Sequence, residues 1–100
     1  MEIVNTLNGQ ELTIALKGEL NSNTAPELEQ SITEQLKGVE TLIFDFKELD
    51  YISSAGLRVL LIAKKVIDKN NGKLIVRHAN EGVMDVFRIT GFTNVLDFED

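Results

Sequence analysis

The chain has 100 residues, 43% of them hydrophobic and 26% charged, which predicts a single small globular domain over residues 1–100. Its net charge of −6 disfavours direct binding to nucleic-acid phosphates, and its lack of cysteine excludes disulfides, thiolate zinc sites and cysteine nucleophiles. The longest apolar run, at residues 59–63, is far shorter than the ~20 residues of a membrane helix, and the first residues lack the basic segment of a secretory signal. We therefore expect a cytoplasmic protein that does not associate with membranes.

The first predicted elements are the two strands of a hairpin. Residues 3–7 form a short apolar stretch, and Asn8 and Gly9 are a strong signal for a two-residue β-turn. Apolar and polar residues then alternate over residues 12–16, which is typical of a half-buried strand. Gly18 marks the predicted end of this second strand.

A helix and a buried strand are predicted next. Residues 21–24 offer several N-cap side chains, Pro26 suits a first helical turn, and Gly38 fits the position just beyond the helix. Residues 41–46 are almost wholly apolar and predict a strand that is covered on both faces. A polar loop is predicted for residues 47–51.

The second half of the chain predicts two more helices, each followed by a strand. A long helical pattern ends near residues 70–72, and an apolar strand follows at residues 73–78. Asn80 is the expected cap of a third helix that stops at Gly91, and residues 95–98 are the last short strand. The order β-β-α-β-α-β-α-β predicts an α/β fold in which helices pack on a mixed sheet and right-handed crossovers join its parallel strands.

A pair of serines, Ser53 and Ser54, precedes the long helix. The free backbone N–H groups and the dipole at a helix start stabilise a negative group, including the phosphate of a phosphoserine. A serine in this place is also a common N-cap, and the residue types alone favour that simpler role.

The long helix carries apolar residues on two of its faces. One face holds the predicted core positions, which are Val59, Ile62, Ala63, Val66 and Ile67. A second stripe, spaced i, i+3, i+4 and i+7, consists of Ser54, Leu57, Arg58 and Leu61. Leucines in line with a candidate modification site predict either a docking surface for a partner or burial beneath a loop.

Three segments resemble a known family. Residues 50–60 read DYISSAGLRVL, residues 18–25 read GELNSNTA, and residues 91–92 read GF. Together they resemble the landmarks of the STAS family, which is named for sulphate transporters and anti-sigma-factor antagonists. The resemblance runs over nearly the whole chain and implies a single free-standing STAS domain.

The resemblance also implies a set of site residues. In the antagonists of this family, the first hydroxyl residue after an acidic one is phosphorylated, and counting back from Gly56 places that residue at Ser54. Ser53 and Asn21 stand where the family usually carries aspartate, so this chain has less negative charge beside the site. The residues expected to contact a partner are Asn21, Ser53, Leu57, Arg58 and Leu61.

The implied function is that of an anti-sigma-factor antagonist. Such a protein binds an anti-sigma factor that is also a serine kinase using ATP, and it thereby releases a sigma factor for transcription. Phosphorylation ends the binding, and a serine phosphatase restores it. The resemblance implies no enzyme activity, cofactor, metal or direct contact with nucleic acid.

Two alternatives belong to other classes. One is a STAS module in a larger signalling assembly that is never phosphorylated, and the other is a small α/β enzyme. The residues argue against an enzyme, because His78 is the only histidine and Ile52 breaks the Gly-x-Ser-x-Gly pattern around Ser54. Asp45, inside an apolar strand, is expected to bond to backbone N–H groups and not to accept a phosphate.

Overall fold

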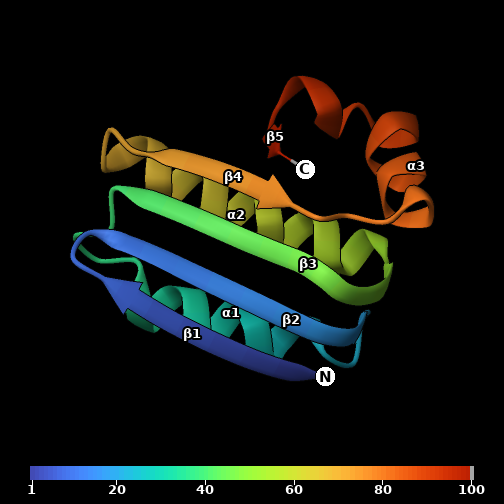
Figure 1. The fold of residues 1–100 in the computed structure, drawn as a ribbon, viewed down its shortest axis with the longest axis horizontal. Helices are drawn as coiled ribbons and strands as arrows, with labels where there is room; N and C mark the ends of the chain where they lie inside the picture. The colour runs from blue at the N-terminus through green and yellow to red at the C-terminus, as the bar shows by residue number, and fades with distance from the viewer. Residues whose placement is uncertain (100) are drawn as a thin grey trace.

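The computed structural model describes residues 1–99, and the predicted order of strands and helices is confirmed (Figure 1). The elements are β1 (Glu2–Asn8), β2 (Glu11–Leu20), α1 (Ala25–Gln35), β3 (Thr41–Ile52), α2 (Ser54–Lys69), β4 (Lys73–Arg77), α3 (Glu81–Thr90), the 3₁₀ turn η1 (Phe92–Asn94) and β5 (Asp97–Glu99). The strands lie in the order β1-β2-β3-β4-β5. The first pair is antiparallel and the others are parallel, so the predicted mixed sheet is also confirmed.

The helices α1 and α2 lie behind the sheet in Figure 1 and cover one of its faces. The strands direct alternate side chains toward this face, because the side-chain period of a strand is two. Leu12 of β2, Leu42 of β3 and Leu74 of β4 are aligned in register, and all three belong to the buried core. The opposite face carries mainly polar and small residues on its flanks, while Ile43 and Ile75 are buried at its centre.

Two strands are longer than the sequence predicts. β2 continues past Gly18 to Leu20, and β3 continues to Ile52, so the predicted polar loop at residues 47–51 was wrong. The pairing of β2 with β3 shifts register near Ala15 and again after Gly18, and Gly18 adopts a φ of 109° that favours glycine. Polar residues enter these two strands because each strand supplies backbone hydrogen bonds to the other.

The last strand is shorter than predicted. Residues 92–94 form a 3₁₀ turn, and β5 begins at Asp97 rather than Val95. The helix α3 was predicted correctly. The side chain of Asn80 accepts the N–H of Val83 at 2.8 Å, and Gly91 ends the helix with a φ of 80°. Within residues 1–99, no helix has the length and apolar character needed to cross a membrane.

Candidate functional site

The ends of β2 and β3 bring together the two segments that carry serine and asparagine candidates. Leu20 and Ile52 are paired at the end of the parallel ladder. The backbone N–H of Ser53 then donates to the carbonyl of Leu20 at 2.9 Å. This bond joins the start of α2 to the end of β2, where the loop to α1 begins, although the two residues lie about thirty positions apart in sequence.

Gly56 allows the first turn of α2 to pack directly against these strand ends. A Cβ atom at this position would lie 2.7 Å from Cγ of Leu20 and 2.9 Å from Cγ1 of Ile52. Both distances are too short for carbon atoms in contact. A side chain at Gly56 would therefore force either the side chains of Leu20 and Ile52 or the helix start itself to shift.

The two serines have different roles in the structure. Ser53 is the N-cap of α2, and its Oγ accepts the N–H of Gly56 at 3.4 Å. Ser54 is the first residue of α2, and its side chain is exposed. The first turn contains no acidic residue, and Arg58 lies exposed one turn further along the helix. An anion on Ser54 would thus meet the positive end of the helix dipole and a cation on the same side of the helix.

The predicted site residue Asn21 shapes the neighbouring loop. Its Oδ1 accepts the N–H groups of Asn23 at 2.9 Å and of Thr24 at 3.2 Å. The hydroxyl of Thr24 accepts the N–H of Asn21 and donates to the carbonyl of Glu19, both at 2.8 Å. Thr24 was predicted only as one of several candidate N-caps, but an asparagine three residues before a threonine at a helix start is a usable signal for such a turn. Contact of Asn21 with a partner stays a prediction.

A surface hollow of about 240 Å³ separates the starts of α1 and α2. Pro26 and Glu29 line it from α1, while Ala55, Arg58 and Val59 line it from α2. Arg58, four residues after Ser54 on α2, thus lies beside the first turns of α1.

The predicted docking stripe on α2 is only partly exposed. Leu57 is 5% exposed and belongs to the core, so its assignment to a partner surface was wrong. Leu61 is 36% exposed, in agreement with the prediction, whereas Ile62 and Val66, both predicted to be core residues, are only half-buried. The buried side chains run from Val59 round to Leu57, an arc of about 160° at 100° per residue. The arc is wide because α2 packs against α1, β3 and β4 together.

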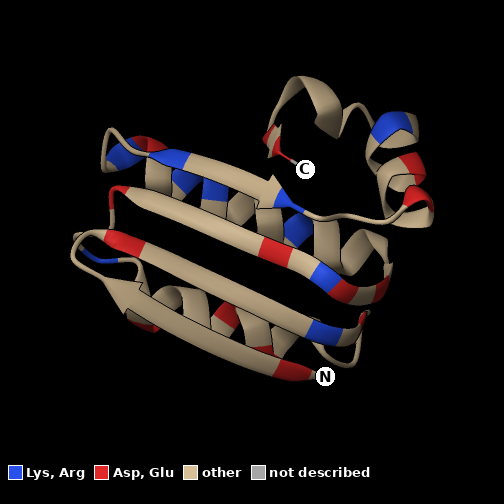
Figure 2. Ribbon diagram, viewed as in Figure 1, with Lys and Arg blue, Asp and Glu red and all other residues tan. Residues whose placement is uncertain are grey.

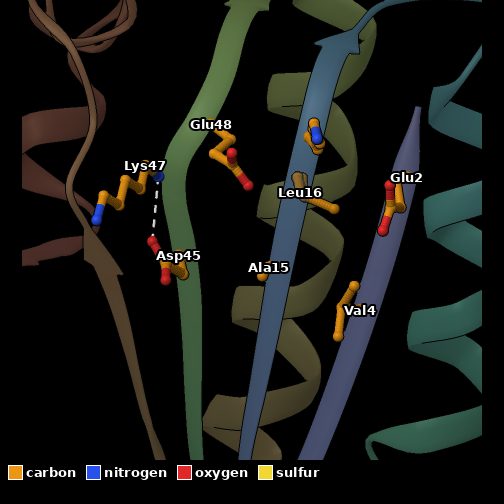
Figure 3. Close-up of a pocket in the computed structure, with 8 residues that line it drawn as sticks. Glu2, Val4, Ala15, Leu16, Asp45, Lys47 and Glu48 are labelled. Atoms are coloured by element: carbon orange, nitrogen blue, oxygen red, sulfur yellow. Dashed lines mark hydrogen bonds between the residues drawn. The ribbon is translucent and has the colours of Figure 1, made fainter.

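Asp45 forms a second polar centre, on the face of the sheet away from the helices (Figure 3). Its Oδ1 accepts the backbone N–H of Lys47 at 3.1 Å, as the sequence predicts for this carboxylate, and lies 3.1 Å from Nδ1 of His78. Partial burial by itself would raise the pKa of Asp45. The hydrogen bonds from His78 and Lys47, together with their positive charges, outweigh burial and hold the pKa below its usual value. Among residues 1–99, no three side chains are grouped as a metal site would require.

The lowered pKa of Asp45 predicts a small, acid-sensitive contribution to stability. Because the folded-state pKa is depressed, this contribution is complete above the usual value of 3.8 and is lost as the pH falls through the lower folded value. We expect Asp45→Asn to destabilise the protein by less than about 1 kcal/mol near neutral pH, since the pair is partly exposed, and by still less near pH 3. Urea midpoints at both pH values measure the change. Asp50→Asn, an exposed carboxylate on the same strand, is the control, and an identical pH response in both variants would contradict the assignment.

The amino-acid sequence of the chain is similar to those of known proteins. The STAS domain family model matches residues 2–100. BtrV of Bordetella bronchiseptica, whose name places it among the anti-sigma factor antagonists, is 39% identical over 85 residues, which are 84% of this chain and 73% of BtrV. The anti-sigma-B factor antagonist of Bacillus subtilis is 26% identical over 90 residues, covering 90% of this chain and 83% of the relative.

Solved structures show the same fold. The crystal structure of tm1081 from Thermotoga maritima has a TM-score of 0.91 at 19% identity and covers 98% of this chain and 86% of that one. The anti-sigma factor antagonist SpoIIAA in its unphosphorylated form has a TM-score of 0.79 at 19% identity, covering 99% of this chain and 88% of SpoIIAA. The Bacillus cell fate determinant SpoIIAA in its phosphorylated form has a TM-score of 0.78, also at 19% identity, covering 99% and 92%. At these identities the likeness supports the fold alone.

Proposed function

The chain belongs to the STAS domain family, and from that premise we propose that it is a cytoplasmic anti-sigma factor antagonist whose binding is switched by phosphorylation of Ser54. It acts by binding and not by catalysis. Two relatives are named as anti-sigma factor antagonists, and SpoIIAA, which has the same fold, exists in a phosphorylated form.

The observation that carries the proposal is that Ser53 forms the N-cap of α2 while the side chain of Ser54 is exposed. Ser53 caps α2, so the hydroxyl of Ser54 is not needed to complete the helix. Ser54 is exposed at the positive end of the helix dipole, and no acidic residue in the first turn repels a phosphate there. The protein can therefore carry a phosphate at Ser54 without unfolding, which a reversible switch requires.

The switch follows from the charge that a phosphate adds. In the unmodified state, the start of α2 binds an anti-sigma factor that is also a serine kinase, and a sigma factor is released. The kinase transfers the γ-phosphoryl group of ATP to Oγ of Ser54, and the hydroxyl proton leaves. The new group carries a charge of about −1.5 to −2, and its desolvation inside an interface is costly. The complex dissociates, and a phosphatase restores binding by hydrolysing the phosphate ester.

The contact surface in this proposal differs from the sequence-based set in one residue. Asn21, Ser53, Arg58 and Leu61 remain candidate contacts around Ser54. Leu57 is replaced by Tyr51, which precedes the serines at the end of β3 and is 49% exposed. An exposed aromatic side chain is a typical anchor in a protein interface.

The direct test is the position of the phosphate. We expect protein isolated from its native cells to contain a species with one added phosphate, and fragment-ion mapping to locate it on Ser54. The hydroxyl groups of Ser53 and Thr90 are already engaged, Ser53 as the cap and Thr90 as a donor to the carbonyl of Val86 at 2.7 Å. Ser54→Ala expressed in the same cells is the control and should lack the added mass. A phosphate found only on Ser53 or Thr90 would refute the proposed site.

A further inference from the structure

The two edges of the sheet are protected to different degrees. β5 is only three residues long, and two of them are the acidic residues Asp97 and Glu99. β1 is seven residues long, and within residues 1–99 no strand pairs with its outer side (Figure 1). Beyond Glu2 it carries no charge (Figure 2), and it contains no proline and no register shift. Proteins normally use charge, proline, bulges or short length to prevent an edge strand from pairing, and β1 has none of these over residues 3–8.

The register of the hairpin identifies the backbone groups that face outward. Gly9 and Gln10 form a two-residue turn, in which Gly9 has a φ of 65°. The flanking residues, Asn8 and Glu11, therefore form a hydrogen-bonded pair. The pairing continues to Glu2 without a shift, so every second residue back from Asn8 also bonds to β2. The alternate residues of β1 direct their N–H and C=O groups to the free edge, and these are Ile3, Asn5 and Leu7.

We propose that β1 pairs antiparallel with β1 of a second copy of this chain, so that two five-stranded sheets join into one continuous sheet. The two-fold axis passes beside Asn5, which faces Asn5 of the second copy. Ile3 then faces Leu7 of the second copy, and Leu7 faces Ile3. Each facing pair exchanges two backbone hydrogen bonds, which satisfies all the outward groups of Ile3, Asn5 and Leu7 in both copies.

The side chains fit this register. On the helix-covered face, Leu7, 65% exposed in the single chain, packs against Ile3 of the second copy. On the other face, Val4, 48% exposed, packs against Thr6. Apolar and β-branched cross-strand pairs of this kind are stabilising. Glu2 faces the uncharged Asn8, so no like charges oppose each other across the ladder.

The elements beside the axis also permit the approach. The side chain of Asn5 donates to the hydroxyl of Ser31 on α1 at 3.2 Å, which places a small residue of that helix next to the axis. Each copy has a net charge of −6, so the copies repel at long range. Salt screens this repulsion, and association should therefore strengthen as salt is added.

Sedimentation equilibrium of the full chain over a range of concentrations tests the dimer. We expect a reversible monomer–dimer equilibrium that Asn5→Pro weakens at least tenfold. Proline removes only an outward N–H at this position, so the hydrogen bonds between β1 and β2 remain. Asn5→Ala keeps that N–H and is the control that should still dimerise. A chain that stays monomeric at all concentrations, or equal effects of Pro and Ala, would overturn the proposal.

Amide hydrogen exchange and a charge-matched pair provide a second test that does not depend on proline. The amides of Ile3, Asn5 and Leu7 should become protected as protein concentration rises, while those of Val4 and Thr6 are protected throughout. Leu7→Lys should dissociate the dimer, whereas Ile89→Lys, at a position 85% exposed on α3, should not. A dimer that forms without concentration-dependent protection of these three amides, or that survives Leu7→Lys, would place the interface elsewhere and refute this pairing.

Discussion

Ser54→Asp is expected to weaken binding to the anti-sigma factor by more than tenfold, or about 1.4 kcal/mol, with no loss of the fold. Aspartate at the first position of α2 is favourable for the helix, because its charge lies at the positive end of the dipole. The same charge must be desolvated when a partner covers this surface, and that cost opposes binding. Titration calorimetry with the cognate anti-sigma factor measures the affinity, and circular dichroism verifies the fold.

Two variants serve as controls for this experiment. Ser54→Ala should bind like the unmodified protein and resist phosphorylation, with little change in stability, because Ser53 and not Ser54 forms the capping bond. Thr33→Asp adds the same charge at an exposed position further along α1 and should leave the affinity unchanged. Equal affinities for Ser54→Asp and Ser54→Ala would count against a switch at this residue.

Leu57→Lys should have the largest effect on stability, with a loss of about 2–5 kcal/mol or failure to fold. Leu57 is 5% exposed within the core, so the substitution removes apolar contacts and places an ammonium group among buried side chains, none of which is charged within residues 1–99. Leu61→Lys should change stability by no more than about 0.5 kcal/mol, because Leu61 is already 36% exposed on the same helix. Urea denaturation of both variants gives the comparison.

The variants Leu57→Lys and Leu61→Lys also distinguish an effect on stability from an effect on binding. Val59 is 2% exposed, so Val59→Ala is the control for a core residue. This variant should be less stable than the wild type although its charge is unchanged. Leu61→Lys should remain folded and bind the anti-sigma factor less tightly. A fully stable Leu57→Lys would show that Leu57 does not occupy the core position assigned to it, and unchanged binding by Leu61→Lys would remove Leu61 from the interface.

Local sequence signals determined the order of elements and several of their ends. The cap at Asn80 and the stop at Gly91 were predicted correctly, and the hairpin turn lies at Gly9 and Gln10, one residue after the predicted Asn8 and Gly9. Each of these features depends on hydrogen bonds or φ values within a few residues. The pairing of β2 with β3 beyond Gly18 was not predictable in this way. This pairing depends on β3, which follows α1 in the sequence. A polar segment becomes a strand when such a partner strand supplies its backbone hydrogen bonds.

The candidate site also has features that are local in sequence and features that depend on tertiary contacts. The two serines before an apolar helix were sufficient to predict the helix start, since a helix start is a local event, whereas the choice of Ser54 as the candidate phosphosite came from the resemblance to the STAS family. Only the tertiary structure decided that Leu20 anchors Ser53 and that Leu57 is buried. Helical periodicity gives the direction of a side chain from its own axis but not the width of the arc that neighbouring elements cover. That width depends on how α1, β3 and β4 pack around α2, and these contacts join residues far apart in the chain.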